Sequence, residues 1–114
     1  MMRECDALSL FSKQARVKIE VIGGKREVEA VVWGVWAIHL SVYPLESKAK
    51  LYTLTHIPTG AEVATNSSQR ALAELAVRLD ALGDWSSSKR GRLPIQRALE
   101  VLEQWREEVN SKRQ

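Results

Sequence analysis

Apolar and polar side chains alternate along residues 16–22, which read RVKIEVI. A period of two is typical of a β-strand with one face in the core and the other in water. Two glycines, Gly23 and Gly24, follow directly, and glycine accepts the positive φ angles that a tight hairpin turn requires. The pattern therefore predicts a half-buried strand that ends in a hairpin.

Residues 27–41 are interpreted as one long strand after that turn. Their even-numbered positions are apolar throughout, whereas the odd-numbered positions begin with two glutamates and become apolar later. Successive side chains of a strand point to opposite faces, so we expect the even-numbered face, with Trp36, in the core. The odd-numbered face is expected on the open side of the sheet. Gly34 lies inside this stretch, where a glycine often marks a bulge or a close backbone approach.

Residues 51–65, LYTLTHIPTGAEVAT, predict a strand, a turn and a short return strand. Threonine suits a strand because its branched Cβ packs well on a pleated surface. Proline fixes φ and glycine adopts the positive φ that other residues avoid, so Pro58 and Gly60 are both typical of a turn. Residues 42–49, just before this segment, are predicted to form a loop.

Leucines at helical spacing follow the last predicted strand. Asn66, with Gln69 three residues later, resembles a capping box and is predicted to begin a helix. Gly83 is suited to end that helix, and Pro94 is suited to the first turn of the next one. Residues 6–15 predict a further, short helix at the beginning of the chain.

These elements predict an α+β fold with an antiparallel sheet of three or four strands. The two C-terminal helices are expected to pack on one face of the sheet, after a short N-terminal helix. A chain of 114 residues favours one domain, residues 1–114, and it is long enough to bury a core without metals or disulfides. Residues 1–5 and 111–114 are expected to fray.

Charge and cysteine content narrow the class of protein only modestly. The formal net charge is +3, spread evenly along the chain, which is a weak signal for nucleic-acid binding. Cys5 is the only cysteine, so no internal disulfide can form, and a cytoplasmic location is expected. The most apolar run, residues 30–40, is shorter than the ~20 residues of a spanning helix, so no membrane association is expected.

Catalytic and metal chemistry find little support in the sequence. His39 and His56 are the only histidines, and strand alternation places them on opposite faces of the sheet. A metal site would need both of them near a carboxylate or a cysteine, and no nucleophile accompanies either one. We therefore expect a protein that is not an enzyme and that needs no metal and no cofactor.

The odd-numbered face of the long strand is the first candidate binding surface. An exposed aliphatic and aromatic patch usually marks an interface, and tryptophan is frequent at binding hot spots. The residues predicted to bind a protein partner, or a second copy of the chain, are Val31, Trp33, Val35 and His39. In the alternative interpretation, the N-terminal segment covers this patch with Leu8 and Phe11.

The linker between the two C-terminal helices is the second candidate, for a nucleic-acid-binding regulator. Arginine binds phosphate oxygens, and a tryptophan ring can stack on an unpaired base. The residues of this surface are Trp85, Lys89, Arg90, Arg92 and Arg97, within and just before the basic stretch 86–97, with Lys112 and Arg113 as further contacts. In the alternative interpretation the linker is solvated and Trp85 packs at the end of the first helix.

Three resemblances extend these expectations. The pattern W-x-I-H at residues 36–39, then YTLTHIPTG, then an alanine-rich helix resembles small phage or mobile-element proteins, which implies an accessory protein that works by binding. The order helix, three strands, helix over residues 6–82 resembles the double-stranded-RNA-binding domain, although SSQRALAEL has only Arg70 where that family has a lysine cluster. The sheet followed by a helix is also similar to the DNA-reading arm-binding domains of phage integrases. The expected function is a non-enzymatic binding or regulatory module.

Overall fold

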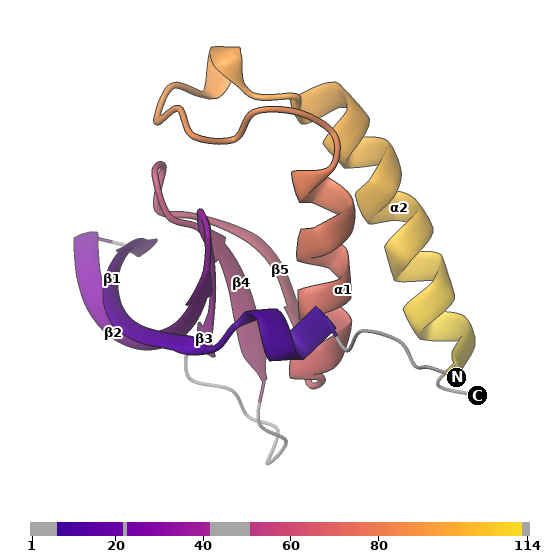
Figure 1. Cartoon of the computed structure of the whole chain (residues 1–114), viewed down its shortest axis with the longest axis horizontal. Coiled ribbons are helices and arrows are strands. Elements are labelled where there is room, and N and C mark those ends of the chain that lie inside the picture. Colours follow the sequence, from indigo (N-terminus) through magenta and orange to yellow (C-terminus); the bar gives the residue numbers. More distant parts are fainter. Residues whose placement is uncertain (1–6, 22, 42–50, 113–114) are drawn as a thin grey trace.

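The computed structural model describes residues 7–21, 23–41 and 51–112, and it confirms the predicted α+β class (Figure 1). One antiparallel sheet holds five strands in the order β1-β2-β3-β4-β5, so each strand lies beside its neighbours in the sequence. The elements are η1, a 3-10 turn (Ala7–Leu10), β1 (Lys13–Val21), β2 (Gly24–Trp33), β3 (Trp36–Leu40), β4 (Tyr52–His56), β5 (Ala61–Asn66), α1 (Gln69–Asp80), the 3-10 turn η2 (Arg90–Arg92) and α2 (Ile95–Lys112).

The predicted long strand is in fact two strands, β2 and β3, joined by a tight turn at Gly34 and Val35. Trp33 pairs directly with Trp36 across this hairpin, and Gly34 has a φ of 60°. Residues opposite each other in a ladder point to the same face, so both tryptophans lie on one side of the sheet. The expectation that Trp33 and Trp36 face opposite sides is therefore wrong, and the sheet has more strands than predicted.

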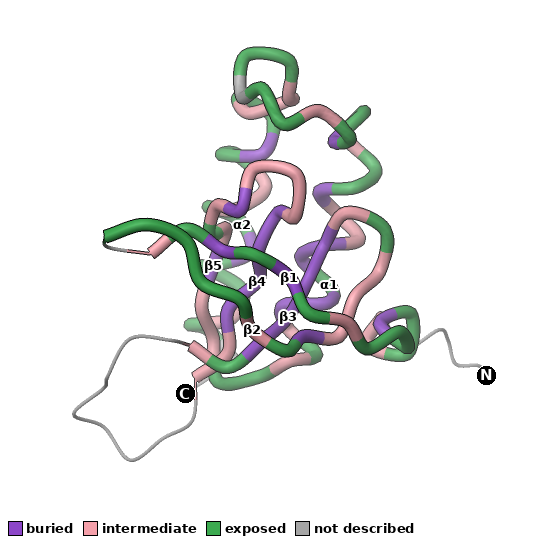
Figure 2. Tube along the Cα trace, turned by 90° about the vertical axis from the view of Figure 1, so that its left-hand side faces the viewer, coloured by how far each residue is buried: buried purple, intermediate pink, exposed green. Residues whose placement is uncertain are grey.

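The sheet is strongly curled, so that β1 returns to the turn between β4 and β5. The amide of Glu20 in β1 donates a hydrogen bond of 2.8 Å to the carbonyl oxygen of Gly60 in that turn. Figure 2 shows β1 and β2 crossing in front of the other strands. The curl encloses a small inner core formed by Val17, Ile19, Ala30 and Ala37.

Gly60 makes this closure feasible, because its φ is +72° and a Cβ there would lie 3.3 Å from the carbonyl oxygen of Lys18. We expect Gly60→Ala to lower the free energy of unfolding by about 1–3 kcal/mol, since a non-glycine residue is strained at this φ. Urea denaturation measures the loss. Gly91→Ala is the matched control, because a Cβ at Gly91 meets open space. Equal losses for the two variants would contradict this role of Gly60.

Helix α1 covers the other side of the sheet and contacts β3, β4 and β5. It begins two residues later than its capping pattern predicts, because the side chain of Ser68, rather than that of Asn66, accepts a hydrogen bond from the amide of Ala71. The side chain of Asn66 instead accepts a hydrogen bond from the amide of Ser68. The helix ends at Asp80, before the predicted stop at Gly83. Its leucines form the main core with residues of the sheet, including Trp36, Ile38 and Leu54.

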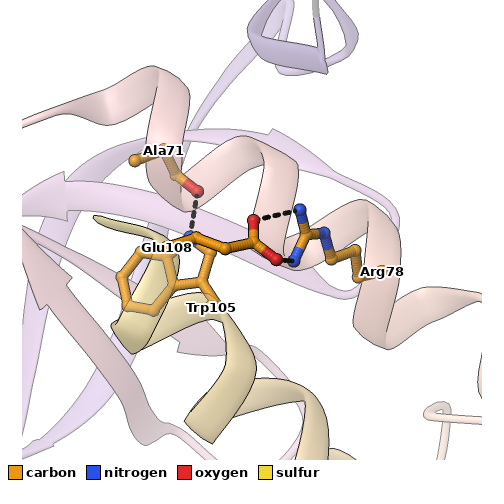
Figure 3. Close-up of polar contacts among 4 residues, drawn as sticks. All are labelled: Ala71, Arg78, Trp105 and Glu108. Carbon is orange, nitrogen blue, oxygen red and sulfur yellow. Dashed lines mark hydrogen bonds and ion pairs between the residues drawn. The ribbon is translucent and has the colours of Figure 1, made fainter. Parts of the chain in front are cut away.

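Side-chain hydrogen bonds of Trp105 and Arg78 hold helix α2 against α1 (Figure 3). The indole N–H of Trp105 donates to the carbonyl oxygen of Ala71 at 2.9 Å. The guanidinium of Arg78 donates to both carboxylate oxygens of Glu108, at 3.1 and 2.7 Å. The expected packing of both helices on one face of the sheet is not confirmed, because α1 lies on the strands and α2 lies on α1.

The ends of the chain differ from the sequence-based expectations in two details. The predicted N-terminal helix, residues 6–15, is only the short turn η1, and β1 already begins at Lys13. Residues 111 and 112, expected to fray, are helical. The predictions for residues 1–5, 42–49 and 113–114 lie outside the described residues. Among the helices that are described, none combines the length and the apolar character needed to cross a membrane.

Candidate functional site

The predicted binding patch on the open face of the sheet does not exist as an exposed surface. Val31, Trp33 and Val35 are partly buried and pack against the main core, on the side covered by α1. The ring of Phe11 lies 5.9 Å from that of Trp33, centroid to centroid, and Leu8 packs against the same core. The alternative interpretation, in which the N-terminal segment covers the patch, matches the structure.

His39, the fourth residue of the predicted patch, is buried on the opposite face. Its Nδ1 lies 2.8 Å from the carbonyl oxygen of Leu40, and its Nε2 lies 2.8 Å from the hydroxyl of Thr55. His56 faces Trp36 on the helix side, so the two histidines lie on opposite faces, as the alternation predicts. Within the described part of the chain, no group of three His, Cys, Asp or Glu side chains is placed to hold a metal ion.

An aromatic cluster lies where the linker crosses the end of α1. The ring of Trp85 contacts Trp36 and His56 at centroid distances of 5.1 and 5.7 Å, and its N–H donates to the carbonyl oxygen of Leu79 at 2.6 Å. His56 lies between two oxygen partners, with Nε2 at 2.6 Å from the carbonyl oxygen of Trp85 and Nδ1 at 2.9 Å from the hydroxyl of Thr59. This cluster ties the linker to the sheet.

Burial of Trp85 corrects the predicted nucleic-acid surface. Only 6% of the residue is exposed, so its ring is not free to stack on a base, and the alternative of packing at the helix end is what the structure shows. Lys89, Arg92 and Arg97 are exposed. The side chains of Arg90 and Lys112, and the whole of Arg113, lie outside the described part. Binding of phosphates by this linker stays a prediction.

Both histidines should make stability depend on pH. Burial lowers the pKa of His39 and of His56 below the ordinary value of 6.5, although a hydrogen bond to a backbone carbonyl opposes the shift at each ring. Below pH 6.5 the unfolded chain therefore binds more protons than the folded chain, so acid favours unfolding. We expect the urea midpoint to be level above about pH 7 and to fall as the pH drops below about 6.5, until the folded chain also binds the protons. A variant with both histidines replaced by glutamine should show a smaller fall, and a midpoint that rises on acidification would contradict the prediction.

A groove runs between the edge strand β5 and the helix α2. In the described sheet, β5 forms a ladder with β4 alone, and β1 approaches β5 where β5 begins, at Gly60. Over the rest of β5, the outer row of backbone N–H and C=O groups has no strand partner. One wall of the groove is β5 (Ala61–Asn66), and the other is the face of α2 from residue 95 to residue 110. We call this feature the β5–α2 groove. Val63, Glu62 and Arg106 line both of its halves, so the groove is continuous.

The half of the groove near the linker is apolar and has a volume of about 280 Å³. We call it the anchor pocket, and its principal walls are Trp36, His56, Trp85, Ile95, Leu99 and Leu102. Leu99 is 60% exposed, unlike the buried Ala98 and Trp105 of the same helix. The other half, about 350 Å³, is lined mainly by polar groups of β5 and of the end of α2.

The sequence signals for this site are weak. Leu99 belongs to the apolar stripe of its helix and is expected to be buried, and nothing local marks β5 as the strand at the sheet edge. A second and larger depression, about 500 Å³, lies at the other end of the sheet beside Leu40 and Tyr52. Its rim carries the ion pair of Arg16 and Glu29, at 3.9 Å, whose side chains are mostly in solvent. It has no tryptophan among its walls, whereas the anchor pocket has two.

Comparison with known proteins gives no relative for this chain. No family model matches it, and no curated protein and no solved structure is significantly similar to it. The function is therefore inferred from the residues and the geometry of this chain.

Proposed function

We propose that this protein is a non-enzymatic binding module that docks on a protein partner through the β5–α2 groove. The proposal keeps the class of function that the sequence favours and moves the binding surface away from Trp33. A role as an accessory protein of a phage or mobile element, and a cytoplasmic location, stay predictions from the sequence.

The observation that carries the proposal is an unpaired strand edge beside an apolar pocket. Exposed sheet edges recognise extended partners through their backbone groups, and adjacent pockets supply specificity for side chains. Trp36 and Trp85 line the anchor pocket as buried residues and fix its shape, so the apolar surface that a partner would meet there is that of Ile95, Leu99 and Leu102. Leu99 stands exposed at its edge, where water would be displaced by a partner.

Binding is favoured over catalysis because the buried polar atoms of the pocket are already engaged. Each ring nitrogen of His56 has an oxygen partner, and so does the indole N–H of Trp85. A general base needs a free nitrogen within reach of the proton that it removes. His56 therefore positions the linker, and the pocket offers shape and apolar surface to a ligand.

Substitution of Leu99 by glutamate should weaken docking strongly without unfolding the chain. A charge in the anchor pocket must be desolvated when a partner binds, so we expect affinity to fall by about tenfold or more. Selection of a random-peptide display library on the full chain, followed by binding measurements on the selected peptides, tests this. Stability should change little, because Leu99 is largely exposed.

Leu40→Glu is the matched control, since Leu40 is a similarly exposed leucine, at 53%, in the other depression. Peptides selected by the unsubstituted chain should bind Leu40→Glu with unchanged affinity. Failure to select any peptide that depends on Leu99 would remove the proposed function. Peptides that lose affinity with Leu40→Glu instead would place the binding surface at the other depression.

A further inference from the structure

We infer that the partner supplies an extended segment that pairs with β5 as a sixth strand, places one large apolar side chain in the anchor pocket, and carries basic residues beside it. This inference rests on the proposed function and adds the mode of binding and the chemistry of the ligand. Backbone groups, pocket chemistry and charge support it separately.

The backbone of β5 favours an extended ligand over a helical one. Backbone N–H and C=O groups on the outer side of an edge strand are a template for another strand. The same groups would lose water without gaining partners if a helix were docked over them, which is unfavourable. Only an extended segment satisfies them while it fills the groove.

A β-bulge shapes this edge. The register between β4 and β5 shifts between Leu54 and Thr55, which pair with Ala64 and Glu62 respectively, so Val63 is the extra residue of β5. Bulges turn a side chain out of the regular alternation and are frequent beside binding sites. Val63 lines both halves of the groove, at the place where the anchor pocket meets the polar half.

The anchor pocket suits an uncharged and fully apolar side chain. Its buried polar atoms are already paired within the chain, through His56 with Thr59 and the Trp85 carbonyl, and through the N–H of Trp36 with Asp80. A polar side chain would therefore find no partner among these buried atoms and would lose its own hydration. An apolar cavity of about 150 Å³ already accommodates benzene, so a pocket of about 280 Å³ admits one aromatic or leucine side chain.

Charge at the rim favours a basic ligand. Glu62 is exposed on the β5 wall, and on α2 the exposed Glu103 lies one helical turn after Leu99, with Glu107 one turn further. Arg106 is the basic side chain that lines the groove. Glu62 on the β5 wall, with Glu103 and Glu107 on α2 outside the lining residues, attracts a segment that carries Lys or Arg beside its apolar anchor.

Peptides selected in the Leu99 experiment are the probes that test this inference. We expect them to share one Phe, Leu, Ile or Trp with Lys or Arg nearby. The tightest of them is labelled with fluorescein and its affinity is measured by polarisation, together with a series in which each backbone nitrogen is methylated in turn. Methylation of alternate residues should weaken binding about tenfold, and methylation of the residues between them should have little effect, because every second N–H of a paired strand faces the edge.

The rim is tested with Glu103→Lys, which should weaken binding of the same peptide about three- to tenfold at low salt. Glu27→Lys, an exposed glutamate of β2 outside the groove, is the matched control and should leave affinity unchanged.

Each failure has a distinct meaning. Absence of any Leu99-dependent peptide overturns the proposed function and the inference together. Three results with Leu99-dependent peptides would overturn the inference and leave the docking function standing. The peptides could be anchored at helical spacing (i, i+3 and i+4), they could be acidic, or their binding could show no alternation on methylation. A concentration-dependent dimer that is lost with Leu99→Glu would show that a second copy of this chain is the occupant, and would also overturn it.

Discussion

Replacement of Trp36 by alanine should lower the free energy of unfolding by about 3–5 kcal/mol, because it opens a large cavity in a core that cannot collapse to fill it. Trp36 is fully buried, its ring packs against those of His56 and Trp85, and its N–H donates to the Asp80 carboxylate at 3.1 Å. The loss is a large part of a typical total of about 5–15 kcal/mol. Urea denaturation followed by far-ultraviolet circular dichroism measures it.

Trp33→Ala is the matched comparison, because Trp33 pairs with Trp36 across the hairpin but is only partly buried. We expect a loss of about 1–2 kcal/mol, since less apolar surface returns to water. A loss for Trp33 equal to or greater than that for Trp36 would contradict the assignment of Trp36 to the centre of the core.

Trp85→Ala should also lower the free energy of unfolding by about 3–5 kcal/mol, for a different reason. Trp85 is the residue that ties the linker to the end of α1, through its N–H and the carbonyl oxygen of Leu79, and to the sheet, through its own carbonyl oxygen and His56. Alanine keeps the backbone carbonyl oxygen but removes the ring and its N–H, so the substitution should release the linker from α1 in addition to leaving a cavity. Urea denaturation gives the total loss, and hydrogen exchange should show faster exchange at the end of α1.

Trp85→Phe separates the two contributions. Phenylalanine keeps much of the aromatic packing and removes the indole hydrogen bond to Leu79, whose carbonyl oxygen still accepts from the amide of Leu82 at 3.0 Å. We therefore expect the free energy of unfolding to fall by about 1–3 kcal/mol, from the lost hydrogen bond and the smaller ring. If Trp85→Phe lowers the free energy of unfolding as much as Trp85→Ala does, the hydrogen bond rather than the packing of the ring holds the linker.

Most of the secondary structure could be predicted from local patterns. The alternation after Arg16 and the threonine-rich strand at Tyr52 both correspond to observed strands, and the leucine spacing corresponds to α1. The hairpin at Gly34 was missed because the residues on both sides of it are apolar, so the turn produces no polar interruption. A glycine followed by one residue between two apolar runs is itself a two-residue hairpin signal, and it would have placed Trp33 correctly.

The binding groove could not be predicted, because it depends on how distant elements are arranged. The apolar stripe of α2 predicts a helix that buries Leu99, as a helix lying flat on a sheet would. The observed α2 packs on α1 through Trp105 and Ala98, and a helix-to-helix contact buries a narrower strip, so Leu99 remains exposed. Local sequence also carries no information on which strand forms the sheet edge, which follows from the order of all five strands.

The hydrogen bond between Glu20 and Gly60 has a consequence for motion. This bond closes the curl between β1 and the turn after β4, and it belongs to none of the strand ladders. If it breaks, the hairpin of β1 and β2 can move outward while every ladder of the sheet remains intact. Such a local opening requires much less free energy than global unfolding. It would briefly expose Val17 and Ile19 to water, so the rate of hydrogen exchange at the Glu20 amide should report local opening in this half of the molecule.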